Sequence, residues 1–230
     1  MEFFLNLLRS VAYGIIEGVT EWLPISSTGH MILAEQVLKF SFSAEFMEMF
    51  RVVIQLGAIL AVVVLYFKKL WPFCADNGRD SGFSRHFRWP VVRLWCKIIV
   101  ACVPAAVLGL LLDDWLDAHL YNSITVALML IIYGIAFILI ERRPRVPTTT
   151  KLSRITYKQA LIVGAWQVLA LIPGTSRSGS TIIGGLLCGM SRPAASQFTF
   201  FLAIPVMAGA SGLKLVKFLA KGGVFTLAEI

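Results

Sequence analysis

Charged side chains are scarce in this 230-residue sequence. Asp, Glu, Lys and Arg make up 15% of the residues, whereas they make up about a quarter of a typical soluble domain. Hydrophobic residues make up 57%. This composition excludes an ordinary soluble protein and predicts a chain that lies in a lipid bilayer.

Other shortages exclude further classes of protein. There are four cysteines and no C-x-x-C pair, so neither a metal cluster nor a disulfide framework is predicted. Acidic residues number 13 against 21 Lys and Arg, which gives a net charge of +8. The basic residues gather in two short loops without interleaved aromatic side chains, which argues against nucleic acid as a partner. No long polar stretch remains for a soluble module, so residues 1–230 are predicted to form one membrane domain.

Four apolar runs are long enough to cross a bilayer. They cover residues 49–67, 94–112, 124–140 and 197–213. Two shorter apolar runs, one before Pro24 and one over residues 161–172, each end at a proline that small polar residues follow. Runs of this length are typical of helices that enter the bilayer and turn back.

The loop charges predict which side of the membrane each loop faces. Lys and Arg concentrate in loops 68–97 and 142–158, so both loops are predicted to be cytoplasmic. Loop 113–117 carries only acidic charges and suits the outer face. Lys214, with Lys217 and Lys221, disagrees, because this scheme places it near the outer end of the last span. We keep the scheme because short, dense loops carry the stronger signal.

The two short runs are related in sequence. Residues 17–30 read EGVTEWLPISSTGH and residues 166–181 read WQVLALIPGTSRSGST. With the predicted sidedness, the first pair of helices enters from outside and the second from the cytoplasm, as in inverted-repeat transporters. The prediction is an all-α, polytopic membrane protein with two re-entrant helical hairpins. The inverted-topology repeats are expected at about 1–110 and 124–230.

Each proline break is followed by hydroxyl groups. Non-helical backbone at membrane depth requires protein or a water-filled cavity around it, so the two breaks predict a polar cavity. Hydroxyls and free N–H groups at the start of a helix bind anions. Arg177 adds a guanidinium matched to phosphate oxygens. The hydroxyl residues are Ser26, Ser27, Thr28, Thr175, Ser176 and Ser178.

Acidic and basic groups complete a candidate catalytic set. Glu17 and Glu21 are four residues apart and share one helical face, where a divalent cation or Arg177 would balance their charges. His30 can donate or accept a proton near neutral pH. Ser27 is the natural nucleophile if a base activates its hydroxyl and positive charge holds the phosphoryl oxygens.

Each of these residues also has a structural interpretation. A serine in a membrane helix usually bonds to its own backbone. Glu17 and Glu21 would equally suit a buried ion pair with Arg177, which itself would suit helix packing, and His30 would suit a core position. The aromatic run at 198–201 favours lipid or core contact over binding of an apolar substrate chain.

These residues resemble the bacterial undecaprenyl-diphosphate phosphatases of the bacitracin-resistance type, and the resemblance covers essentially the whole chain. Its motifs are EGVTE at 17–21, LPISSTGH at 23–30, VIQLG at 53–57 and PGTSRSG at 173–179. The resemblance implies an enzyme that hydrolyses undecaprenyl diphosphate to the monophosphate carrier and inorganic phosphate. Such an enzyme recycles the carrier for peptidoglycan synthesis and confers bacitracin resistance.

The resemblance also implies roles for the residues. Ser27 is the implied nucleophile and His30 the implied acid or base, in a reaction assisted by a divalent cation, Mg²⁺ or Ca²⁺. Glu17 and Glu21 would hold the metal or orient the other groups. The implied phosphate-binding residues are Ser26, Thr28, Ser176, Arg177, Ser178 and Thr181.

The family further implies a place in the cell and an assembly. The active site is expected to face the periplasm or exterior of the bacterial cytoplasmic membrane, and homodimers are expected. Family members continue with about two more membrane helices, so the second repeat is expected to be incomplete where this sequence stops, at Ile230.

Two other functions compete with hydrolysis. A transporter that flips or exchanges a lipid phosphate would share the inverted repeat and broken helices. Ser27 and His30 beside two glutamates favour the hydrolase, since a carrier has little use for a nucleophile and a proton shuttle. An anion channel fits Arg177 but not the two buried glutamates.

Overall fold

The structure of this chain, a computed structural model, is all-helical. It describes residues 2–74, 86–120, 122–142, 146–220 and 222. Within these ranges there are two isolated β-bridges and no β-strand. The predicted all-α class is confirmed. Several charged residues used to predict sidedness lie outside the described residues, namely Arg79, Arg85, Arg143, Arg145 and Lys221.

Four stretches are long and apolar enough to cross a membrane, and they coincide with the four predicted spans. The first, Ala44–Leu65, is formed by two consecutive helices with a turn at Ile54. This is a multi-pass membrane protein. The spanning helices are α3 (Ala44–Val53) with α4 (Gln55–Leu65), α6 (Trp89–Leu120), α7 (Ser123–Glu141) and α10 (Arg192–Ala220).

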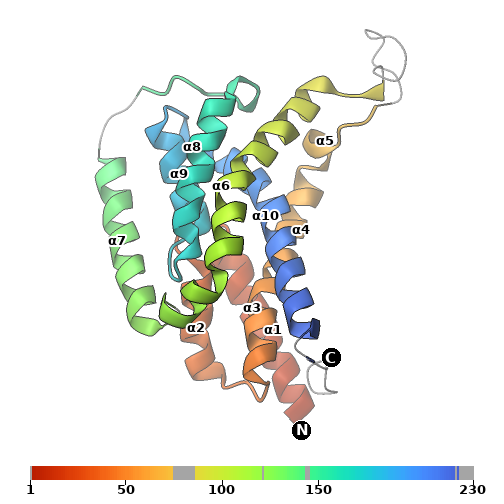
Figure 1. The fold of residues 1–230 in the computed structure, drawn as a ribbon, viewed down its shortest axis with the longest axis vertical. Coiled ribbons are helices and arrows are strands. Elements are labelled where there is room, and N and C mark those ends of the chain that lie inside the picture. The colour runs from red at the N-terminus through yellow and green to blue at the C-terminus, as the bar shows by residue number, and fades with distance from the viewer. Residues whose placement is uncertain (1, 75–85, 121, 143–145, 221, 223–230) are drawn as a thin grey trace.

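Four of the remaining helices form two pairs, α1 with α2 and α8 with α9. Figure 1 shows α1 and α2 in the lower half of the molecule and α8 and α9 in the upper half, with the turn of each pair directed toward the middle. The predicted inverted repeat requires this arrangement, but the repeat, its two ranges and the re-entrant insertion remain predictions. The bounds are α1 (Glu2–Thr20), α2 (Ser27–Leu38), α5 (Phe67–Leu70), η2 (Leu152–Arg154), α8 (Tyr157–Gln167), η3 (Val168–Leu171) and α9 (Arg177–Leu187).

Polar side chains fix where the helices begin. The Asn122 side chain accepts a hydrogen bond of 2.9 Å from the backbone N–H of Thr125 at the start of α7. Thr156 and Gln159 form a reciprocal capping box at the start of α8. Because these caps satisfy N–H groups that a helix leaves free, each helix starts at a defined residue.

The helix ends that flank the two basic loops lie at one end of the molecule. In Figure 1 α5, the start of α6, the end of α7 and the start of α8 are at the top, while the end of α6 and the start of α7 are at the bottom. Lys214, which disagreed with the predicted sidedness, donates to the Glu48 carboxylate of α3 at 2.8 Å. Its charge is therefore balanced within the protein, which weakens it as an orientation signal.

The main core lies between α6, α8 and α10. Ile98, Val163, Phe198 and Phe201 are all 1% exposed or less. The core interpretation of the aromatic run is thus confirmed for Phe198 and Phe201. Phe200 instead packs edge-on against Trp22, with ring centroids 5.1 Å apart.

A close backbone contact joins α6 to α8. A Cβ atom added at Gly164 would lie 2.3 Å from the carbonyl oxygen of Ala101. We expect Gly164→Ala to push the helices apart and to lower the free energy of unfolding by about 1–3 kcal/mol, the usual cost of overpacking. Unfolding in detergent micelles measures this effect. Gly57→Ala is the control, since a Cβ there meets nothing within 4 Å; equal stability of the two variants would contradict the prediction.

Candidate active site

The first proline turn presents Ser27 at the start of α2. Ser26 caps this helix, and its hydroxyl accepts from the Gly29 backbone N–H at 3.3 Å. Ser26 has a φ of 66°, a left-handed conformation that costs a residue other than glycine about 1–3 kcal/mol. The cap and the turn together hold Ser27, which is 6% exposed.

Glu21 lies at the centre of the site. The Ser27 hydroxyl donates to Glu21 Oε2 at 2.5 Å, and Arg177 Nη2 forms an ion pair with Glu21 Oε1. The carboxylate and guanidinium side chains are 9% and 11% exposed. One carboxylate therefore joins the predicted nucleophile of the first turn to the predicted phosphate-binding arginine of the second.

The second proline turn is shaped by Gly174. Its φ is 88°, and a Cβ there would lie 2.6 Å from the Val126 Cα of α7, so only glycine fits. Ser176 then caps α9 by accepting from the Gly179 N–H at 3.0 Å, and its hydroxyl is 3.2 Å from that of Ser178. Arg177 is the first residue of α9, where the helix dipole favours an anion.

His30 makes a hydrogen bond to the backbone of the first turn, and its predicted role as acid or base stays a prediction. Its Nδ1 is 2.8 Å from the backbone carbonyl oxygen of Ser26. Since a carbonyl oxygen only accepts, Nδ1 is the donor in this contact. The Ser27 hydroxyl donates to the Glu21 carboxylate, which therefore lies where a base would act on that hydroxyl.

The two threonines predicted to contact phosphate differ. The Thr181 hydroxyl donates to the Arg177 carbonyl oxygen at 2.9 Å and accepts from Thr199 at 3.0 Å. It is 1% exposed, so its hydrogen-bonding capacity is used within the protein. Thr28 is half-buried on the first turn of α2, beside Ser27.

Glu17 is buried beside the ion pair without being part of it. The side chain is 1% exposed, and Oε1 has no hydrogen-bond partner among the described residues. An orphaned carboxylate oxygen one helical turn from Glu21 fits a hard cation, since Mg²⁺ is commonly held by one or two carboxylates together with substrate phosphates. Over the described residues, no group of three or more His, Cys, Asp and Glu side chains gathers for a metal ion.

Two buried polar residues near the second turn lack partners, and sequence reasoning missed the first of them. Gln167 is 2% exposed, and within the described part of the chain neither of its amide atoms has a partner. The Thr175 hydroxyl is buried and equally unpaired there. Gln167 interrupts the apolar run before Pro173, and this break in the run is the signal that could have identified it.

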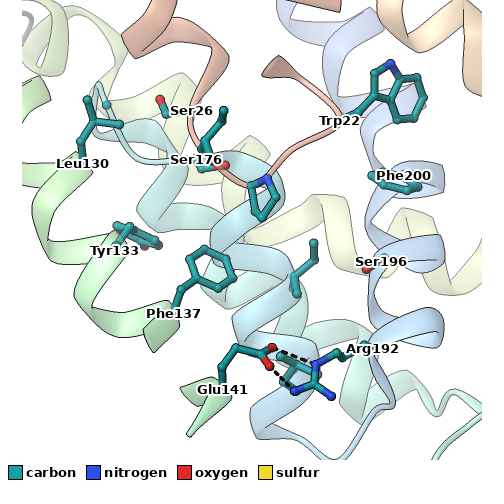
Figure 2. Close-up of a pocket in the computed structure, with 16 residues that line it drawn as sticks. Trp22, Ser26, Leu130, Tyr133, Phe137, Glu141, Ser176, Arg192, Ser196 and Phe200 are labelled. Atoms are coloured by element: carbon teal, nitrogen blue, oxygen red, sulfur yellow. Dashed lines mark hydrogen bonds and ion pairs between the residues drawn. The ribbon is translucent and has the colours of Figure 1, made fainter. Parts of the chain in front are cut away.

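A groove of about 640 Å³ runs from the two turns along α7. Ser26 and Ser176 line one end, and the exposed ion pair between Glu141 and Arg192 lines the other, as Figure 2 shows. We call this cavity the α7 groove. Its apolar lining residues include Leu130, Tyr133, Phe137, Ile182, Leu186 and Phe200.

The buried ion pair is open to a double-mutant test. Removal of either partner strands a buried charge, so Glu21→Ala and Arg177→Ala are each expected to lower the free energy of unfolding by about 3–5 kcal/mol. The double variant should lose clearly less than the sum of the two. Unfolding in detergent gives the coupling. Glu141 and Arg192, which are paired but exposed, are the matched control and should show a far smaller coupling energy. Equal coupling energies in the two pairs would contradict the prediction.

Comparison with known proteins agrees with this geometry. A family model described as bacitracin resistance protein BacA matches residues 10–229. An undecaprenyl-diphosphatase of Enterococcus faecalis is 60% identical over 229 residues, which cover 99% of this chain and 81% of that protein. Undecaprenyl-diphosphatases of Streptococcus gordonii and Lactococcus lactis subsp. cremoris are 54% and 53% identical, over 99% and 98% of this chain and 80% of each relative. The chain belongs to the BacA family of bacitracin resistance proteins.

Proposed function

We propose that this chain is a membrane phosphatase that hydrolyses undecaprenyl diphosphate to undecaprenyl phosphate and inorganic phosphate. The observation that carries the proposal is the contact of the Ser27 hydroxyl with a carboxylate that also pairs with Arg177. A nucleophile, a base and an anion-binding group therefore meet at one point. The relatives named undecaprenyl-diphosphatase, similar over nearly the whole chain, supply the substrate.

The first step would be attack of Ser27 Oγ on the terminal phosphorus. The hydroxyl proton passes to Glu21 Oε2, which already accepts its hydrogen bond. The bond between the bridging oxygen and the terminal phosphorus breaks, and undecaprenyl phosphate leaves. Arg177 and the N–H groups at the start of α9 stabilise the negative charge on the transferred phosphoryl group.

The second step would release phosphate from Ser27. A water molecule attacks the phosphoserine, the phosphorus–Oγ bond breaks and the serine oxygen recovers a proton. Glu21, protonated in the first step, would return that proton to Ser27 Oγ as the phosphorus–Oγ bond breaks, and the protons of the water would stay on the released phosphate. The hydroxyls of Ser176 and Ser178 lie beside Arg177 and would hold the phosphoryl oxygens.

Glu17 and Glu21 would hold a divalent cation, Mg²⁺ or Ca²⁺. The cation would supply positive charge to the phosphoryl oxygens when bound. The unpaired Oε1 of Glu17 supports this part of the proposal. Glu21 is less available to bind the cation, because both of its carboxylate oxygens already have partners.

The proposal includes a place and an assembly. The site would face the exterior or periplasmic side of the bacterial cytoplasmic membrane. The arrangement in Figure 1 supports this. The start of α1 and the end of α2 lie at the bottom of the molecule, opposite α5 and the start of α8, which flank the basic loops. A homodimer belongs to the same proposal, on the strength of the family resemblance.

Replacement of the proposed nucleophile gives the direct test. Ser27→Ala should lower phosphate release from undecaprenyl diphosphate in detergent by on the order of 10³-fold or more, and a chelator of divalent cations should also abolish release. Ser180→Ala is the matched control, since Ser180 is fully buried and donates to the Arg177 carbonyl oxygen; it should stay close to native. Near-native release by Ser27→Ala would exclude the covalent step.

Two roles of His30, positioning of the turn and proton transfer, can be distinguished by substitution. The amide nitrogen of Asn can take the place of Nδ1 and donate to the Ser26 carbonyl, but Asn cannot carry a proton to the substrate. If His30 positions the turn, as its contact indicates, His30→Asn should retain most of the native kcat/KM and His30→Ala should lose it. Equal loss in both variants would restore His30 as the acid or base.

A further inference from the structure

We propose that the α7 groove binds the part of the polyprenyl chain nearest the diphosphate and so determines how well a long-chain substrate is used. This inference rests on the proposed function. The groove begins at Ser26 and Ser176, and each is followed in sequence by a residue of the proposed phosphate site, Ser27 and Arg177. A lipid whose diphosphate lies in that site therefore has its first carbons at the mouth of the groove.

The lining of the groove suits an isoprenoid chain. Leu130, Tyr133 and Phe137 are spaced three and four residues apart, so they share the face of α7 that lines the groove. Ile182 and Leu186 do the same on α9. Figure 2 shows Tyr133 and Phe137 between the serine end and the ion pair. An apolar chain along this path would exchange lipid contacts for aromatic and aliphatic ones.

The position of the groove explains why the chain would not have to leave the bilayer. The helices α7 and α10, which form two of its walls, are candidate membrane spans. The volume of about 640 Å³ lies within the range of about 300–1,000 Å³ typical of ligand pockets. The exposed ion pair between Glu141 and Arg192 bounds the far end, so the groove would hold only the part of the chain nearest the diphosphate.

Gly134 allows the groove to be filled without disturbing the fold. It lines the groove, and a Cβ added there meets nothing within 4 Å. Gly209 on α10 has the same free space and does not line the groove. A series of Ala, Leu and Trp at position 134, matched by the same series at position 209, therefore separates filling of the groove from the general effect of replacing a helical glycine.

The test compares two diphosphates of different chain length. With undecaprenyl diphosphate, kcat/KM should fall as the side chain at position 134 grows, by about tenfold or more for Gly134→Trp. Isopentenyl diphosphate has a far shorter chain and makes little use of the groove, so all variants should hydrolyse it at similar rates. The series at position 209 should leave both substrates unaffected.

Two results would overturn the inference. If Gly134→Leu and Gly134→Trp use undecaprenyl diphosphate within about twofold of native, the groove does not hold the chain and ordinary bilayer lipid occupies it. If both substrates lose rate equally across the series, the side chain acts on the phosphate site instead.

Binding without turnover separates this inference from the proposed function. Native mass spectrometry in detergent measures how much undecaprenyl diphosphate the native chain, Gly134→Trp and Gly209→Trp retain. Weaker retention by Gly134→Trp alone would support the groove even if the native chain released no phosphate, a result that would reject the hydrolase. Equal retention by all three would overturn the groove whatever the hydrolase activity.

Discussion

The ion pair between Glu21 and Arg177 joins residues that are 156 positions apart in the sequence. Its partners belong to two separate helical pairs, so the site exists only where the two turns meet. A charge at this depth is costly unless it is paired, and each partner makes the other tolerable. The same carboxylate accepts a hydrogen bond from the Ser27 hydroxyl, so the interaction that balances the buried charges also orients the proposed nucleophile.

Much of this architecture could be predicted from composition and spacing. The four spans follow from apolar length alone, and the two breaks at Pro24 and Pro173 follow from proline and small polar residues within short apolar runs. Arg177 stood out because an arginine in such a run has no inexpensive structural role. These signals are local in sequence, so they could be recognised without knowledge of the fold.

The hydrogen-bond and ion-pair partners within the site could not be predicted from the sequence. Glu17 and Glu21 are equivalent in the sequence pattern, yet Glu21 takes both Arg177 and Ser27 while one oxygen of Glu17 has no partner among the described residues. His30 looked like the base because it follows Ser27 closely, but one helical turn directs its Nδ1 to the Ser26 carbonyl. The pairing of Arg177 with Glu21 depends on the angle at which two distant turns meet, and no spacing rule encodes that angle. The contact of His30 is local, but it depends on the conformation of the first turn.

The turn at Gly174 has a consequence for inhibitors. Its positive φ and the nearby backbone of Val126 exclude every side chain at that position. A compound that contacted the peptide groups of this turn would meet a surface that the protein cannot alter by substitution at residue 174 without moving α7. Mutations that confer resistance would be rarer for a compound that binds this backbone than for one that binds the surrounding side chains.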